Sequence, residues 1–188
     1  MPRMGQEPKR RAALLAATVE EVGLAGTLDV TVGQIARRAG MSPALAHHYF
    51  GGKADIFLAA MRQILTDYGA EVRAALRTAP EGRRLEALIA ANFSESCFAP
   101  ATVSAWLNFY VLARRDAQAA RLLRVYQARL RSNLVHALQP RAAAPQLAAR
   151  RIAALIDGVY LRAALSGEGV AGAAEEVIAA AHALADIR

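Results

Sequence analysis

The sequence has few of the residues that build disulfides, metal sites or membrane spans. Cys97 is its one cysteine, which excludes an internal disulfide and a multi-cysteine zinc site, and predicts a reducing, cytoplasmic location. No apolar run approaches the roughly 18 residues of a membrane span. The apolar stretch 12–19 is followed at once by Glu20 and Glu21, which is unlike a signal peptide. We therefore expect a soluble protein whose first helix includes this stretch.

Alanine is what the sequence has in abundance. Its 45 alanines lose no side-chain entropy in a helix, so the composition predicts an all-α fold. Lysine and arginine number 23 against 16 acidic residues, a formal net charge of +7. This excess is divided between residues 1–62, with net +3, and residues 63–188, with net +4. The charge is compatible with binding to nucleic acid but does not locate it.

Apolar residues repeat at intervals of three and four, and glycine or proline separates the repeats. No stretch shows the alternation of a strand. The expected helices span residues 8–23, a short segment between Thr31 and Gly40, and residues 43–49, 53–78, 83–96, 101–115, 117–138, 146–166 and 172–186.

Two short helices near the N-terminus have clear capping signals. Thr31 is followed three residues later by Gln34, the pattern of a capping box. Ser42 is an expected N-cap, and Pro43 fills the first helical position, where a missing N–H costs nothing. Two short helices joined by a turn at Gly40 form the unit of helix-turn-helix DNA-binding proteins. The second is alanine-rich and slim enough for a major groove about 12 Å wide.

The segment 31–53 resembles the N-terminal domain of TetR-family transcriptional repressors. The capped Thr31, the pairs Ile35-Ala36 and Ala39-Gly40, the capped Ser42 and the ending Tyr49-Phe50 before Lys53 carry the resemblance. It implies phosphate contacts by Thr31, Ser42, His47, His48 and Lys53, and base contacts by Gly33, Pro43, Ala44 and Leu45.

The groove-facing positions are unusual in this sequence. Pro43, Ala44 and Leu45 have no side-chain hydrogen-bonding groups. Base recognition would then depend on apolar contacts with thymine methyls, on His47 and main-chain groups, and on DNA shape. Arg37 and Arg38 fit a solvated helix face and a phosphate contact equally well.

The resemblance also implies a domain organisation. It predicts a three-helix DNA-binding domain at residues 1–52 and a larger helical ligand-binding and dimerisation domain at residues 53–188, about nine helices in all. The small apolar stripes of 146–166 and 172–186 suggest a homodimer built as a four-helix bundle. As a dimeric repressor, the protein would bind a palindromic DNA operator. Intrachain packing is the alternative for these stripes.

Aromatic residues gather in the middle of the chain. Trp106, Phe109 and Tyr110 share a helical face, and Asp157 shares one with Tyr160. An aromatic box with an acidic group suits a quaternary ammonium ion. The alternative is that the aromatic residues are core and that Asp157 pairs with an arginine across a dimer. The candidate ligand-binding residues are Phe93, Trp106, Phe109, Tyr110, Asp157 and Tyr160.

Four further segments, residues 92–93, 105–109, 130–134 and 154–167, are similar to choline-responsive repressors of glycine betaine synthesis genes within that family. The similarity implies choline as effector. An alternative is a TetR-type repressor of an efflux or catabolic operon, with another cationic or hydrophobic small molecule as its effector.

Enzymatic activity is not expected. No His-Glu-X-X-His spacing, phosphate-binding glycine loop or Gly-X-Ser-X-Gly segment occurs, so we predict no catalytic residue, metal site or cofactor. A helical adaptor without DNA binding remains as the other alternative, and the capped helix pair argues against it.

Overall fold

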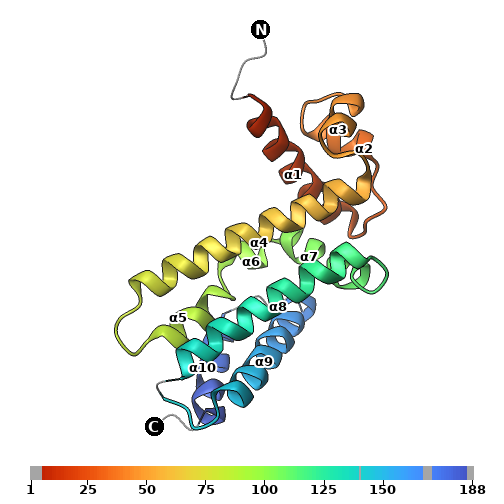
Figure 1. The fold of residues 1–188 in the computed structure, drawn as a ribbon. Coiled ribbons are helices and arrows are strands. Elements are labelled where there is room, and N and C mark those ends of the chain that lie inside the picture. Colours follow the sequence, from red (N-terminus) through yellow and green to blue (C-terminus); the bar gives the residue numbers. More distant parts are fainter. Residues whose placement is uncertain (1–5, 140, 167–170, 186–188) are drawn as a thin grey trace. The chain divides into compact units, whose positions relative to one another are not determined.

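The computed structural model describes residues 6–139, 141–166 and 171–185, and these are helical with no strand among them (Figure 1). The all-α prediction is confirmed. The helices are α1 (Gln6–Ala25), α2 (Val32–Arg38), α3 (Pro43–Phe50), α4 (Lys53–Thr78), α5 (Arg84–Ala91), α6 (Glu95–Phe98), α7 (Pro100–Leu112), α8 (Ala117–Leu138), α9 (Pro145–Ser166) and α10 (Ala173–Leu184).

Most predicted boundaries agree with the structure to within two residues. The exceptions are the helix expected at 101–115, which ends three residues earlier as α7, and the single helix expected at 83–96, which is two helices, α5 and α6, separated at residues 92–94. Asn92 lies at the break, where its side chain donates to Leu88 O at 2.8 Å and accepts from the Tyr68 hydroxyl at 2.7 Å. Residues 167 and 186, which were part of the sequence predictions, lie outside the described residues.

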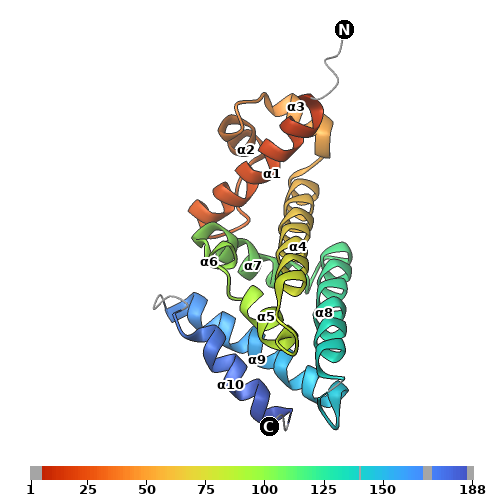
Figure 2. The same ribbon diagram turned by 90° about the vertical axis from the view of Figure 1, so that its left-hand side faces the viewer.

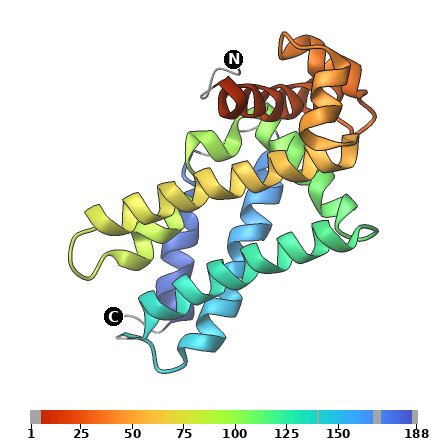
Figure 3. The same cartoon turned by 45° about the horizontal axis from the view of Figure 1, so that its top comes forward.

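The chain divides into two compact units. The first contains residues 6–66 and 99–122, and the second contains residues 67–98 and 123–185 apart from the undescribed positions. In the first unit α1 packs against α2 and α7, and α2 packs against α3 (Figure 3). Gly23 allows the close approach of α1 to α7, since a Cβ there would lie 2.7 Å from the Cα of Ala101.

The second unit has its own hydrophobic core. In this unit α10 packs against α9 and α5, and Figure 2 shows α9 and α10 side by side. His182 Nε2 lies 3.1 Å from a carboxylate oxygen of Glu86, which joins α10 to α5. The largest fully buried side chains of this core are Leu85, Leu88, Ile89, Leu134, Leu138, Ile152 and Ile156.

Within the described part of the chain, no helix has both the length and the apolar character that a membrane crossing needs.

Candidate functional site

The first candidate site is the pair of short helices in the first unit. Thr31 caps α2 as predicted: its hydroxyl oxygen accepts from Gln34 N at 3.1 Å, and Gln34 Oε1 accepts from Thr31 N at 2.7 Å. Gly40, with φ of 67°, takes the left-handed conformation that the turn requires. Ser42 Oγ then accepts from Leu45 N at 3.2 Å and caps α3. The capping predictions are confirmed.

All nine predicted DNA-binding residues lie in this unit. Gly33 and Leu45 are partly buried, and the remainder are exposed: Thr31, Ser42, Pro43, Ala44, His47, His48 and Lys53. The hydroxyl of Thr31 also donates to Gln34 Oε1 at 2.8 Å, so it must rotate before it can donate to a phosphate. Ser42 has no such donated bond among the described residues. Their roles on DNA stay predictions.

Arg38 has a structural partner. Its guanidinium bonds to Glu21 and lies 3.3 Å from a carboxylate oxygen of Glu20, which joins α2 to α1. The hydrogen bond to Glu21 is the main reason why the pKa of Arg38 is raised. Of the two arginines at the end of α2, only Arg37 shows no ion pair within the described part of the chain. Arg37 and Arg38 have the same two possible roles on sequence grounds, and the structure shows that they differ.

Arg11 likewise has a position that sequence reasoning missed. It donates to Tyr49 O at 2.9 Å, and its guanidinium lies 4.4 Å from the ring centroid of Phe50. These contacts join α1 to the end of α3. No sequence spacing reveals them, because the partners are more than thirty residues apart.

Replacing Arg11 by alanine is expected to lower the free energy of unfolding by about 1 kcal/mol, because a cation–π contact and a hydrogen bond are lost. Urea unfolding measures this directly. Arg10→Ala is the matched control, since the bond that Arg10 forms among the described residues is to Gln6 on its own helix. If both variants are equally stable and only Arg11→Ala loses DNA affinity, Arg11 is a DNA contact instead.

The second candidate site is a cluster of aromatic rings in the second unit. The ring of Phe98 lies 4.7 Å from that of Tyr160 and 6.1 Å from that of Phe93. The ring of Tyr68 lies 5.8 Å from that of Tyr126. The Tyr160 hydroxyl donates to Cys97 O at 3.0 Å, which fixes its ring against α6.

Asp157 belongs to the same part of this unit. It precedes Tyr160 by three residues on α9, so the two side chains are neighbours. Burial raises the pKa of Tyr68, and the nearby Cys97 and Asp157 raise it further. Asp157 is partly buried, and this burial raises the pKa of its carboxyl to about 6. Among the described residues it has no hydrogen bond or ion pair.

The six predicted ligand-binding residues are thus divided. Phe93, Asp157 and Tyr160 lie in the second unit. Trp106, Phe109 and Tyr110 lie in the first, where the Trp106 ring is 5.7 Å from Phe109 and 5.6 Å from Tyr110; Phe109 has no exposed surface. The structure adds Tyr68, Phe98 and Tyr126, which reach the cluster from other helices. Their assignment to a ligand stays a prediction.

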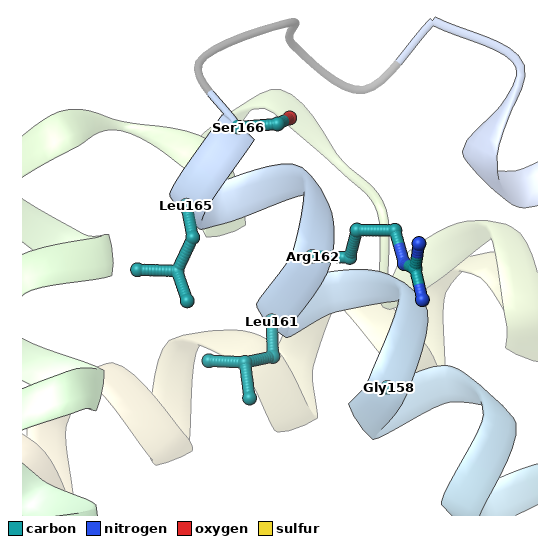
Figure 4. Close-up of a pocket in the computed structure, with 5 residues that line it drawn as sticks. All are labelled: Gly158, Leu161, Arg162, Leu165 and Ser166. Atoms are coloured by element: carbon teal, nitrogen blue, oxygen red, sulfur yellow. The ribbon is translucent and has the colours of Figure 1, made fainter.

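A shallow apolar groove lies on α9. Leu161 and Leu165 extend from one side of the helix while Arg162 extends from another, as Figure 4 shows. The two leucines are 42% and 67% exposed, which is unusual for such large apolar side chains on adjacent turns. This surface lies on one of the two helices expected to form a dimer.

The all-helical fold and the capped helix pair define a helix-turn-helix DNA-binding regulator. Residues 14–60 match the family of bacterial regulatory proteins called the tetR family. Residues 80–187 match the family described as BetI-type transcriptional repressor, C-terminal. The chain therefore belongs to the BetI-type transcriptional repressors of the TetR family, whose members are regulators of transcription and not enzymes.

Curated relatives agree with this assignment. The chain is 50% identical over 173 residues to the HTH-type transcriptional regulator BetI of Brucella anthropi, covering 89% of this chain and 88% of that protein. It is 48% identical over 170 residues to the regulator BetI of Rhizobium meliloti, covering 88% and 83%.

Solved structures show the same fold. A transcriptional regulator from Pseudomonas aeruginosa superimposes with a TM-score of 0.82 at 27% identity, covering 98% of this chain and 91% of that one. A regulator from Saccharomonospora viridis, crystallised in complex with choline, has a TM-score of 0.81 at 22% identity and covers 92% and 95%.

Proposed function

We propose that this repressor responds to choline and controls genes for glycine betaine synthesis. Residues 1–52 would bind a palindromic operator, and residues 53–188 would bind the effector and form the homodimer through α9 and α10. The protein would act in the cytoplasm, where its DNA is. The observation that carries the effector proposal is the partly buried carboxylate of Asp157, which has no hydrogen bond or ion pair among the described residues and lies by the aromatic cluster.

The chemistry of this cluster fits a quaternary ammonium ion. Such an ion has no N–H donors, so it binds through charge and through the faces of aromatic rings rather than through hydrogen bonds. Phe98 and Tyr160 supply ring faces next to each other, and Asp157 supplies the opposite charge. Burial disfavours the ionised carboxyl, and a bound cation would offset this cost. The choline complex of the regulator from Saccharomonospora viridis supports the choice of ligand.

Binding of choline would lower the affinity of the dimer for DNA by favouring one conformation of the protein over another. A ligand shifts such an equilibrium only by its difference in affinity for the two states. In a dimer, the two recognition helices must match consecutive major grooves. We therefore place the effect of choline on the spacing of these helices.

Calorimetric titration and operator binding test the proposal together. Choline is expected to bind the folded dimer and to reduce its affinity for DNA from upstream of choline-oxidation genes. Dimethylbutanol, the neutral carbon isostere of choline, controls for charge and is expected to bind at least tenfold more weakly, because it forms no cation–π contacts. Glycine betaine and betaine aldehyde are titrated in the same way as choline.

The second candidate function is a repressor of an efflux or catabolic operon with another cationic or hydrophobic effector. The same aromatic and acidic residues favour it, since they fit any lipophilic cation. The absence of heat with all three quaternary amines, together with binding of a larger hydrophobic cation, would support this function instead.

A further inference from the structure

The exposed face of α3 has few groups that can recognise a base. Ala46 is fully buried, and Leu45, Tyr49 and Phe50 are partly buried. The exposed side chains of this helix are Pro43, Ala44, His47 and His48. The first two cannot form side-chain hydrogen bonds. Among the exposed side chains of α3, the groups that can form hydrogen bonds with a base are therefore the two imidazoles.

His47 is held in one tautomer by the turn that follows it. Its Nδ1 bonds to the carbonyl oxygen of Gly51, and the N–H of Gly51 donates back to His47 O at 2.8 Å. A carbonyl oxygen only accepts, so Nδ1 must have the hydrogen. The turn is fixed in this position because Gly51 has a φ of 78°, a conformation that favours glycine.

This tautomer determines what the outer edge of the ring offers. In the neutral imidazole one nitrogen donates and the other accepts. Because Nδ1 is the donor, Nε2 has an unshared pair and only accepts. A phosphate oxygen also only accepts, so neutral His47 is a poor partner for the DNA backbone. In its neutral form His47 therefore lacks the donor for the phosphate contact that the family resemblance implies for this residue.

We infer that His47 recognises an exocyclic amino group, adenine N6 or cytosine N4, through Nε2 in the major groove. These amino groups are the donors that bases present there, whereas guanine and thymine present acceptors at the corresponding atoms. A guanine or thymine at this position would face the Nε2 lone pair with another lone pair. His47 is thus a specificity-determining residue. This inference rests on the proposed role of α3 as the recognition helix.

His48 is the natural comparison. It is also exposed, but its ring only tilts against Tyr49 at 5.6 Å and has no hydrogen bond among the described residues. Neither of its nitrogens is committed, so it can donate to a phosphate or accept from a base. The two adjacent histidines therefore differ in the chemistry that they offer to DNA.

The first test needs no DNA. Long-range proton–nitrogen correlation spectra of the full-length protein at pH 8, above the ordinary range of histidine titration, report the tautomer of each ring. We expect His47 to have its hydrogen on Nδ1 and His48 to show a mixture. A neutral His47 with its hydrogen on Nε2 overturns the inference.

The second test is a double-mutant cycle on DNA at the same pH. Purine in place of single adenines, and the corresponding pyrimidinone in place of cytosines, removes one amino group at a time from the operator. At one position per half-site we expect about a tenfold loss of affinity with the wild type and none with His47→Ala. His48→Ala is the matched control and should retain the full loss at that position.

The outcomes separate this inference from the proposed function. If His47→Ala weakens all operators equally and lowers the salt dependence by about one ion, His47 contacts a phosphate and the inference is wrong. If the wild type binds no palindromic operator at all, the proposed function fails instead. Circular dichroism of His47→Ala, with an unchanged spectrum and melting temperature, excludes loss of folding as the cause.

Discussion

Asparagine in place of Asp157 is expected to stabilise the unliganded protein and to remove most of its affinity for choline. The pKa of this carboxyl is about 6 in the fold, against an ordinary value of 3.8. Such a difference corresponds to at most about 3 kcal/mol against the ionised form at neutral pH. The amide of asparagine keeps part of the desolvation cost, so a gain of about 1–2 kcal/mol is expected.

The sign of the pH dependence follows from the direction of the shift. The folded state holds this proton more tightly than the unfolded state, so the carboxyl makes the wild type lose stability as the pH rises from about 4 to about 6. Above that range the cost is constant. Urea unfolding at pH 4.5 and 7.5 is expected to show that Asp157→Asn gains stability over the wild type mainly at pH 7.5.

Choline affinity is expected to rise with pH, whereas the stability of the wild type falls. The cation favours the ionised carboxylate, so affinity is expected to fall by up to tenfold for each pH unit below about 6. Titration of Asp157→Asn at pH 7.5 is expected to show at least a tenfold weaker affinity that no longer depends on this proton. Both effects together would mark a residue that is retained for binding at a cost in stability.

Glu175→Gln provides the matched control. Glu175 is an exposed carboxylate of α10, and its replacement changes the net charge by the same amount. Glu175→Gln should leave the free energy of unfolding at pH 7.5 unchanged. It should change choline affinity by no more than a factor of two. Unchanged unfolding and unchanged choline binding in Asp157→Asn would mean that the carboxyl is solvated and has no part in the effector site.

Local signals predicted much of this structure. The capping box of Thr31 with Gln34 and the Ser42-Pro43 start of α3 act within a few residues, so the sequence alone determines them. The bounds of α8 were also predicted, because its apolar stripe is continuous. Where the local pattern is strong, tertiary contacts need not be known.

Features that depend on distant partners were not predictable in the same way. At the break after α5, Asn92 accepts a hydrogen bond from Tyr68, 24 residues away. The helical spacing of Trp106, Phe109 and Tyr110 was visible in the sequence, whereas the cluster at Tyr160 draws Phe98 from another helix. Positions of Tyr68 and Phe98 in that cluster follow from packing, for which one sequence gives no signal.

The exposed leucines of α9 lead to the other prediction with a large effect. Leu161 and Leu165 lie one turn apart on the same side of the helix (Figure 4). Burying one leucine side chain contributes about 1.5–3 kcal/mol, and a two-fold interface buries each of them twice. If α9 meets a second copy of itself, this surface contributes a large part of the free energy of dimerisation.

Glutamate in place of Leu165 is therefore expected to convert the dimer to a monomer. It removes the apolar contact and places two like charges across the two-fold axis, so the dimer dissociation constant should rise at least about a hundredfold. Sedimentation equilibrium measures this constant. Operator affinity should fall by about 10²–10⁴, because each subunit then binds its half-site alone.

Leu24→Glu is the control for this substitution, since Leu24 is 74% exposed on α1 in the other unit. It should leave the dimer intact. Choline binding separates the remaining possibilities: a monomeric Leu165→Glu protein that still binds choline is folded and has lost only its partner. A dimer that survives Leu165→Glu with unchanged operator affinity would show that the subunits meet elsewhere, and the four-helix arrangement of α9 and α10 would have to be abandoned.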